Sequence, residues 1–193
     1  MKKVLLLPVI LLLLSLQSCE FAEDNPYYIT YTGIDYLVIR YYWDSGTGGT
    51  DLDTRTAIVD PARNIDVGWA RGATDGGFLE WGGDNTGVGY ESVLISLREL
   101  ATRYTGHRKF DIRMRAFWFS TRISGDINIE FTGYDGGRMV KDGYNWINQG
   151  GTQLGQATVI RNIVTQVGSN VDGDEAGIAR YYVKDEVLEI LDP

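Results

Sequence analysis

The chain has 193 residues, 44% of them hydrophobic, which is enough for one domain with a substantial core. Acidic residues outnumber basic ones by 26 to 18, and a surface of this charge repels nucleic acid, so nucleic-acid binding is excluded. The single cysteine and single histidine exclude the usual Cys/His zinc sites. A Ser-His-Asp or Cys-His catalytic arrangement would have to use His107, the single histidine. We expect His107 to be an ordinary surface residue.

Residues 1–18 have the layout of a signal peptide. Lys2 and Lys3 give a positively charged start, and the apolar run that follows, VLLLPVILLLLSL, is too short for a spanning helix. The next motif, LQSC at residues 16–19, resembles the lipobox of bacterial lipoproteins. That resemblance implies that Cys19 carries acyl chains, which anchor the protein to a membrane. An ordinary signal peptide followed by an unmodified cysteine is the alternative.

Residues 19–26 are expected to be the lipidated cysteine and an acidic tether. The motif EFAEDNP resembles the export tag of surface lipoproteins in Bacteroidetes-type bacteria, while a solvated tether is the other interpretation. We therefore expect a lipid-anchored protein of the bacterial cell envelope, at the outer membrane, and surface-exposed if the tag interpretation holds. Without Lys2 and Lys3, 16 basic residues remain against 26 acidic ones, a net charge of −10.

The rest of the chain, residues 27–193, has the pattern of an all-β domain. Segments rich in β-branched and aromatic residues occur at 27–32, 35–43, 111–119, 126–132, 157–167 and 177–183, with glycine-rich turns between them. In 111–119 the apolar residues alternate with Arg113 and Arg115, which face the other way. One short helix is expected within 96–104. This pattern predicts a β-sandwich of two mainly antiparallel sheets.

Two glycine-rich loops carry acidic and amide side chains. The first, WDSGTGGTDLD at 43–53, and the second, WGGDNTGVGYES at 81–92, together offer six candidate metal ligands: Asp44, Asp51, Asp53, Asp84, Asn85 and Glu91. Strand alternation would place Asp51 and Asp53 on one face and turn Leu52 into the core. Clustered carboxylates repel one another unless a cation neutralises them, and oxygen ligands of this kind suit Ca²⁺. A hairpin tip with ordinary solvated charge is the alternative.

The same two loops resemble the TerD family of tellurium-resistance and stress-response domains over roughly residues 35–100. The matching motifs, in order, are Trp43-Asp44, Asp51-Leu52-Asp53, Gly83-Asp84-Asn85, Thr86-Gly87-Val88-Gly89 and Glu91. The resemblance implies a calcium-binding β-sandwich in which Asp51, Asp53, Asp84, Asn85 and Glu91 belong to the site. Two departures stand out. Family members usually carry Gly-Asp-Asp before the glutamate, whereas this loop is shorter and has Tyr90 there, so that two carboxylates are absent and a two-ion site would be reduced to one. Relatives also tend to be cytoplasmic, whereas this chain is expected to be exported.

These features predict a non-catalytic, calcium-binding envelope lipoprotein that acts in protein interaction or stress response. Its expected partners are the membrane, through Cys19, and an envelope protein or glycan of unknown identity. A metal-independent glycan-binding or adhesin-type module is the first alternative, with candidate aromatics Tyr41, Tyr42, Trp43, Trp118 and Trp146. A hydrolase that uses the acidic cluster is the second. A further acidic stretch, NVDGDEAG at 170–177, is expected to be an exposed turn.

Overall fold

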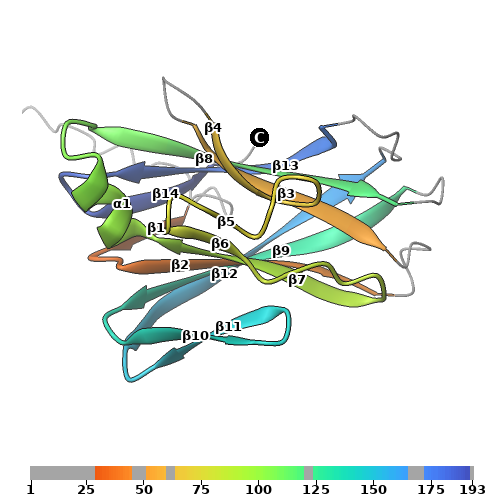
Figure 1. The fold of residues 1–193 in the computed structure, drawn as a ribbon, viewed down its shortest axis with the longest axis horizontal. Coiled ribbons are helices and arrows are strands. Elements are labelled where there is room, and N and C mark those ends of the chain that lie inside the picture. The colour runs from red at the N-terminus through yellow and green to blue at the C-terminus, as the bar shows by residue number, and fades with distance from the viewer. Residues whose placement is uncertain (1–28, 45–50, 60–63, 120–123, 165–171, 192–193) are drawn as a thin grey trace, which may run out of the picture.

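The computed structural model describes residues 29–44, 51–59, 64–119, 124–164 and 172–191. The signal peptide, Cys19 and the acidic tether that the sequence predicts lie outside the described residues. Where the chain is described, it forms an all-β sandwich of two six-stranded antiparallel sheets with one short helix, as the sequence predicts (Figure 1). No helix in these ranges has the length and apolar composition needed to cross a lipid bilayer.

The first sheet has the strand order β1-β14-β13-β8-β3-β4, and all its pairings are antiparallel. Its strands are β1 (Ile29–Thr32), β3 (Leu52–Val59), β4 (Asn64–Gly68), β8 (Lys109–Trp118), β13 (Asp174–Tyr182) and β14 (Val187–Leu191). Strand β4 pairs with β3 only from Arg55 onward, so the first residues of β3 extend past it.

The second sheet has the order β12-β9-β2-β7-β6-β5 and is also antiparallel. Its strands are β2 (Tyr36–Trp43), β5 (Thr74–Asp75), β6 (Leu79–Trp81), β7 (Gly89–Ser96), β9 (Gly125–Asp135) and β12 (Thr152–Ile163). The hairpin β10 (Arg138–Asp142) and β11 (Asn145–Gln149) projects below this sheet in Figure 1. Helix α1 (Leu97–Arg103) follows β7 directly.

The core lies between the two sheets and follows the two-residue period of the strands. In β2, Leu37, Ile39, Tyr41 and Trp43 are all at most 1% exposed, and they belong to one buried cluster with apolar side chains of β3 and β8. Trp118 and Trp146 are buried as well, so Tyr42, at 39% exposure, is the only one of the five aromatics proposed for glycan binding that lies at the surface. The burial of the other four therefore weakens the glycan-binding alternative.

Candidate metal centre

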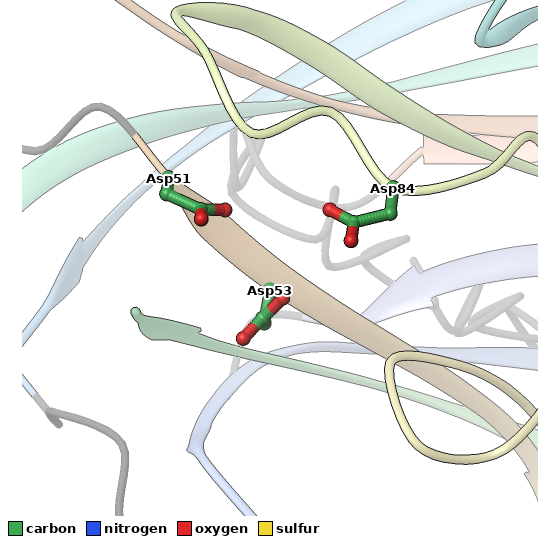
Figure 2. Close-up of side chains that lie close together, drawn as sticks. All are labelled: Asp51, Asp53 and Asp84. Atoms are coloured by element: carbon green, nitrogen blue, oxygen red, sulfur yellow. The ribbon is translucent and has the colours of Figure 1, made fainter. Parts of the chain in front are cut away.

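Three aspartates from two distant segments meet at the end of the sandwich where β3 begins. Asp51 immediately precedes β3, Asp53 is its second residue, and Asp84 lies in the loop between β6 and β7. One carboxylate oxygen from each lies within 4.8 Å of the others. Figure 2 shows Asp51 and Asp53 on β3 with Asp84 opposite them. The structure therefore brings together three of the six ligands predicted from the sequence.

Strand pairing with β8 fixes the orientation of Asp51 and Asp53. Leu52 pairs with Trp118 and is fully buried in the core, which turns the residues on either side of it to the opposite face of the sheet. The Phe119 backbone N–H donates a hydrogen bond of 2.9 Å to the Asp51 carbonyl and continues the ladder beyond the end of β8. Asp53 thus projects from β3, and Asp51 from the position before it, which is still hydrogen-bonded to the neighbouring chain segment.

Two glycines set the course of the loop that carries Asp84. A Cβ atom on Gly82 would lie 2.4 Å from the Tyr144 carbonyl oxygen, so only glycine lets the loop pass this close to the β10–β11 hairpin. Gly83 has a φ of +113°, a conformation that side chains with a Cβ rarely adopt. The Gly82 N–H donates to the Ser92 carbonyl at 2.7 Å, and Ser92 Oγ donates to the Tyr144 carbonyl. The two glycines therefore allow the backbone conformation that places Asp84 in the loop.

Glu91 is fully buried between the sheets and holds the loop between β6 and β7 through hydrogen bonds. Its Oε2 accepts hydrogen bonds from Thr54 Oγ1 of β3 and from Trp81 Nε1 at 3.2 Å, and its Oε1 accepts one from the Asn85 backbone N–H at 3.1 Å. Burial raises the pKa of Glu91 to about 8, against the opposing effect of these three donors. Both of its oxygens are engaged, so Glu91 supports the metal centre and lies outside the triad.

Asn85 also has a supporting role. Its side-chain oxygen accepts a hydrogen bond from the Gly87 N–H at 3.2 Å, and its side-chain nitrogen donates to the Tyr90 carbonyl at 3.3 Å. These two bonds close the loop on itself, as asparagine side chains commonly do in turns. The side chain predicted as a ligand therefore stabilises the loop conformation next to Asp84.

Asp44 does not join the triad. Its side chain is exposed and lines a separate surface groove with Asp126, Asn128 and Asn162, at the ends of β2, β9 and β12. The prediction that Asp44 shares the site depended on its position directly after a strand. In the structure, Asp44 lies beside residues of β9 and β12 in that groove and is not part of the cluster of Asp51, Asp53 and Asp84.

The electrostatics of the triad suit the binding of a cation. Burial raises the pKa of Asp53 to about 7, and repulsion from Asp51 and Asp84 adds to this, while Arg55 opposes it. Burial and Asp84 raise the pKa of Asp51 as well. Within the described part of the chain, Asp51 Oδ1 and Asp53 Oδ2 are buried oxygens that accept no hydrogen bond. Because a buried acceptor without a partner is costly, the three carboxylates fit a metal ion that is bound through oxygen.

Thr54 and Trp81 are residues of the candidate site that the sequence does not reveal. Both donate to Glu91, one from the facing sheet and one from the neighbouring strand β6. Thr54 follows Asp53 directly and could have been placed on the core face by strand alternation. Nothing in the sequence indicates that its partner is Glu91, 37 residues away.

Comparison of this chain with models of protein families, with curated proteins and with solved structures finds no match.

Proposed function

We propose that the protein is a calcium-binding, non-catalytic envelope lipoprotein whose TerD-like sandwich acts in protein interaction or stress response. The observation that carries the calcium proposal is the pair of buried, unpartnered carboxylate oxygens on Asp51 and Asp53, two residues that form one carboxylate cluster with Asp84. A divalent cation would replace mutual repulsion with attraction and satisfy both oxygens at once.

The donor set favours calcium over other metals. The described cluster consists of carboxylates alone, whereas zinc and copper sites use histidine or cysteine. Calcium accepts about six to eight oxygens in irregular geometry, which water and carbonyl groups can complete. Magnesium requires near-octahedral geometry and gives up its water reluctantly. A site whose third ligand, Asp84, comes from an irregular and exposed loop is better suited to calcium.

Calcium would stabilise the folded state because the site does not exist in the unfolded chain. A protein outside the cytoplasm meets calcium concentrations that fill even weak sites. The lipid anchor on Cys19 would hold this ion-stabilised domain at the outer membrane, where it would contact another envelope component. A metal-independent glycan-binding module remains the alternative function, with Tyr42 as its one exposed candidate aromatic.

The test is calorimetric calcium titration of the full chain purified in detergent, together with thermal melts in chelator and in calcium. We expect saturable binding and a higher melting temperature in calcium. Asp84→Ala should weaken binding by more than about tenfold, since one charged ligand is lost. Asp84 is exposed, so this change leaves the core intact. Superimposable melts, or an Asp84→Ala variant with the full calcium response, would refute the proposal.

A further inference from the structure

A second charged site lies on the outer face of the first sheet, next to the aspartate triad, since Arg55 follows Asp53 by two residues on the same face of β3. It is a pocket of about 150 Å³. Its charged lining residues are Arg55, Arg71, Arg113, Arg115, Asp66 and Asp172. Arginines thus outnumber aspartates two to one among the described residues of the pocket, although the chain as a whole is acidic. The pocket is a local region of positive charge.

Arg55 is held in place by two aromatic rings. Its guanidinium lies 5.5 Å from the centre of the Trp69 ring and 5.1 Å from that of Phe117, and its Nε donates to the Trp69 carbonyl at 3.2 Å. The side chain is only 9% exposed. The structure therefore presents a fixed cation at the base of the pocket.

The register of the sheet places like charges opposite one another. Arg55 of β3 and Arg115 of β8 are direct cross-strand partners, and Arg113 lies two residues further along the same face of β8. Like charges at directly opposed positions destabilise a sheet. Such an arrangement is tolerated more easily where an anion occupies the space between the guanidinium groups.

Asp172 compensates this charge only loosely. Its carboxylate contacts three guanidinium groups, at 3.3 Å from Arg55, 3.4 Å from Arg71 and 3.2 Å from Arg115. Elsewhere on the same sheet, Arg180 binds Asp111 at 2.7 Å, the usual length for a charge-assisted hydrogen bond. Asp66 adds a contact of 3.4 Å with Arg71, so these two aspartates pair with the arginines of the pocket at longer distances than Asp111 does with Arg180.

We propose that this pocket binds a phosphate group, either as free phosphate or as the terminal phosphate of a lipid headgroup. Arginines from β3, β8 and the segment after β4 surround one small volume, and together they offer many N–H donors. A phosphate has enough oxygens to engage several guanidinium groups at once, whereas a carboxylate has only two. Asp172 competes with this ligand for the arginines and would lose part of its contacts with them when phosphate binds.

The test is calorimetric titration of inorganic phosphate into the full chain in detergent, with chelator present so that calcium cannot mediate binding. We expect saturable binding at one site per chain. Arg115→Gln should weaken it by about tenfold, the effect of losing one hydrogen bond to a charged group. Asp172→Asn should tighten it, because the internal competitor is removed. Arg138→Gln, an exposed arginine on β10, is the charge-matched control and should bind phosphate like the wild type.

Vesicles distinguish the two sources of phosphate. Phosphatidylcholine vesicles with phosphatidic acid should bind the protein in an Arg115-dependent manner if the ligand is a lipid headgroup, and pure phosphatidylcholine vesicles should not. If the protein binds free phosphate but not these vesicles, the ligand is a soluble phosphate and not a lipid headgroup. The proposal is overturned if neither phosphate source binds, or if Arg138→Gln weakens binding as much as Arg115→Gln. The chelator separates this result from the calcium proposal.

Discussion

Thr54 and Glu91 join the two sheets of the sandwich through a buried hydrogen bond, in which the threonine hydroxyl donates to the carboxylate. Thr54 is the neighbour of the triad residue Asp53 on β3. The other oxygen of Glu91 accepts the Asn85 N–H, next to Asp84. This one carboxylate therefore sets the position of the Asp84 loop relative to the strand that carries the other two aspartates.

Thr54→Val should consequently weaken calcium binding several-fold, because it removes a donor to Glu91 while keeping the side-chain shape. The control is Thr56→Val on the same strand, whose hydroxyl pairs with Tyr41 Oη at 2.7 Å. Each change removes one buried hydrogen bond and should lower the free energy of unfolding by about 1 kcal/mol. Calorimetry and urea unfolding separate the two effects. Equal calcium affinities in both variants would show that Glu91 has no positioning role.

The two aspartates that flank the first glycine loop should behave differently on substitution. Asp51→Asn removes a charge from the triad and should weaken calcium binding by more than about tenfold. Asp44→Asn removes the same charge from the separate groove and should change the affinity less than about twofold, since only a screened long-range interaction is lost. A large loss in Asp44→Asn would mean that the predicted ligand set was right and that Asp44 joins the site when calcium binds.

The close approach of Gly82 to the hairpin gives a prediction about loop geometry. Gly82→Ala should force the loop away from Tyr144 and weaken calcium binding, because the new Cβ would lie 2.4 Å from a backbone oxygen. Gly87→Ala is the control in the same loop, where the nearest atom to a new Cβ is the Asn85 side-chain oxygen, at an ordinary 3.7 Å. If Gly82→Ala and Gly87→Ala bind calcium with the same affinity, Gly82 does not have this role.

The sequence predicts most of the architecture because long strands carry a clear signal. The alternation at residues 111–119 corresponds to β8, and the predicted helix at 96–104 to α1. The shorter strands β4, β5, β10 and β11 are polar or glycine-rich, and tertiary pairing stabilises them more than local preference does. Local pattern reasoning has no access to that pairing.

The site was predictable only in part, for a similar reason. Asp51 and Asp53 share a face because alternation is a local property, and Asp84 was found through the motif around it. The separate position of Asp44 depends on which strands neighbour β2, and the buried position of Glu91 depends on packing between sheets. The arginine pocket shows the same limit. The sequence places Arg113 and Arg115 on one face but does not show that Arg55 faces them.

In calcium-free solution the free energy of unfolding should fall as the pH rises from about 5 to about 8. Burial and neighbouring carboxylates raise the pKa of Asp53 to about 7, and burial raises that of Glu91 to about 8. In the unfolded chain both pKa values lie near 4, so in this window the folded state holds protons that the unfolded state has released. Stability is therefore highest at the acidic end and is lost as the pH rises through the folded-state pKa values.

Calcium should reduce or reverse this pH dependence, because the ion binds the ionised carboxylates and competes with protons. Asp53→Asn should flatten the calcium-free curve, since one of the carboxyl groups with a raised pKa is gone. Thermal melts across the pH range in chelator and in calcium provide the measurement. If the melting temperature of the wild type in chelator does not change with pH, the pKa of neither carboxyl group is raised in the folded protein.

The ion pair between Asp111 and Arg180 should produce the opposite pH dependence. Two hydrogen bonds from Arg180, of 2.7 and 3.3 Å, hold the pKa of Asp111 below its usual range. Asp111→Asn should therefore lower the free energy of unfolding by about 0.5–1 kcal/mol at neutral pH, the usual range for a partly exposed pair. The difference should vanish as the pH falls through the pKa of the folded state, because the wild type is then protonated too. Urea unfolding at several pH values measures this, with the exposed Asp142→Asn as control. A difference that persists unchanged in acid would assign the effect to packing at Asp111 and not to its charge.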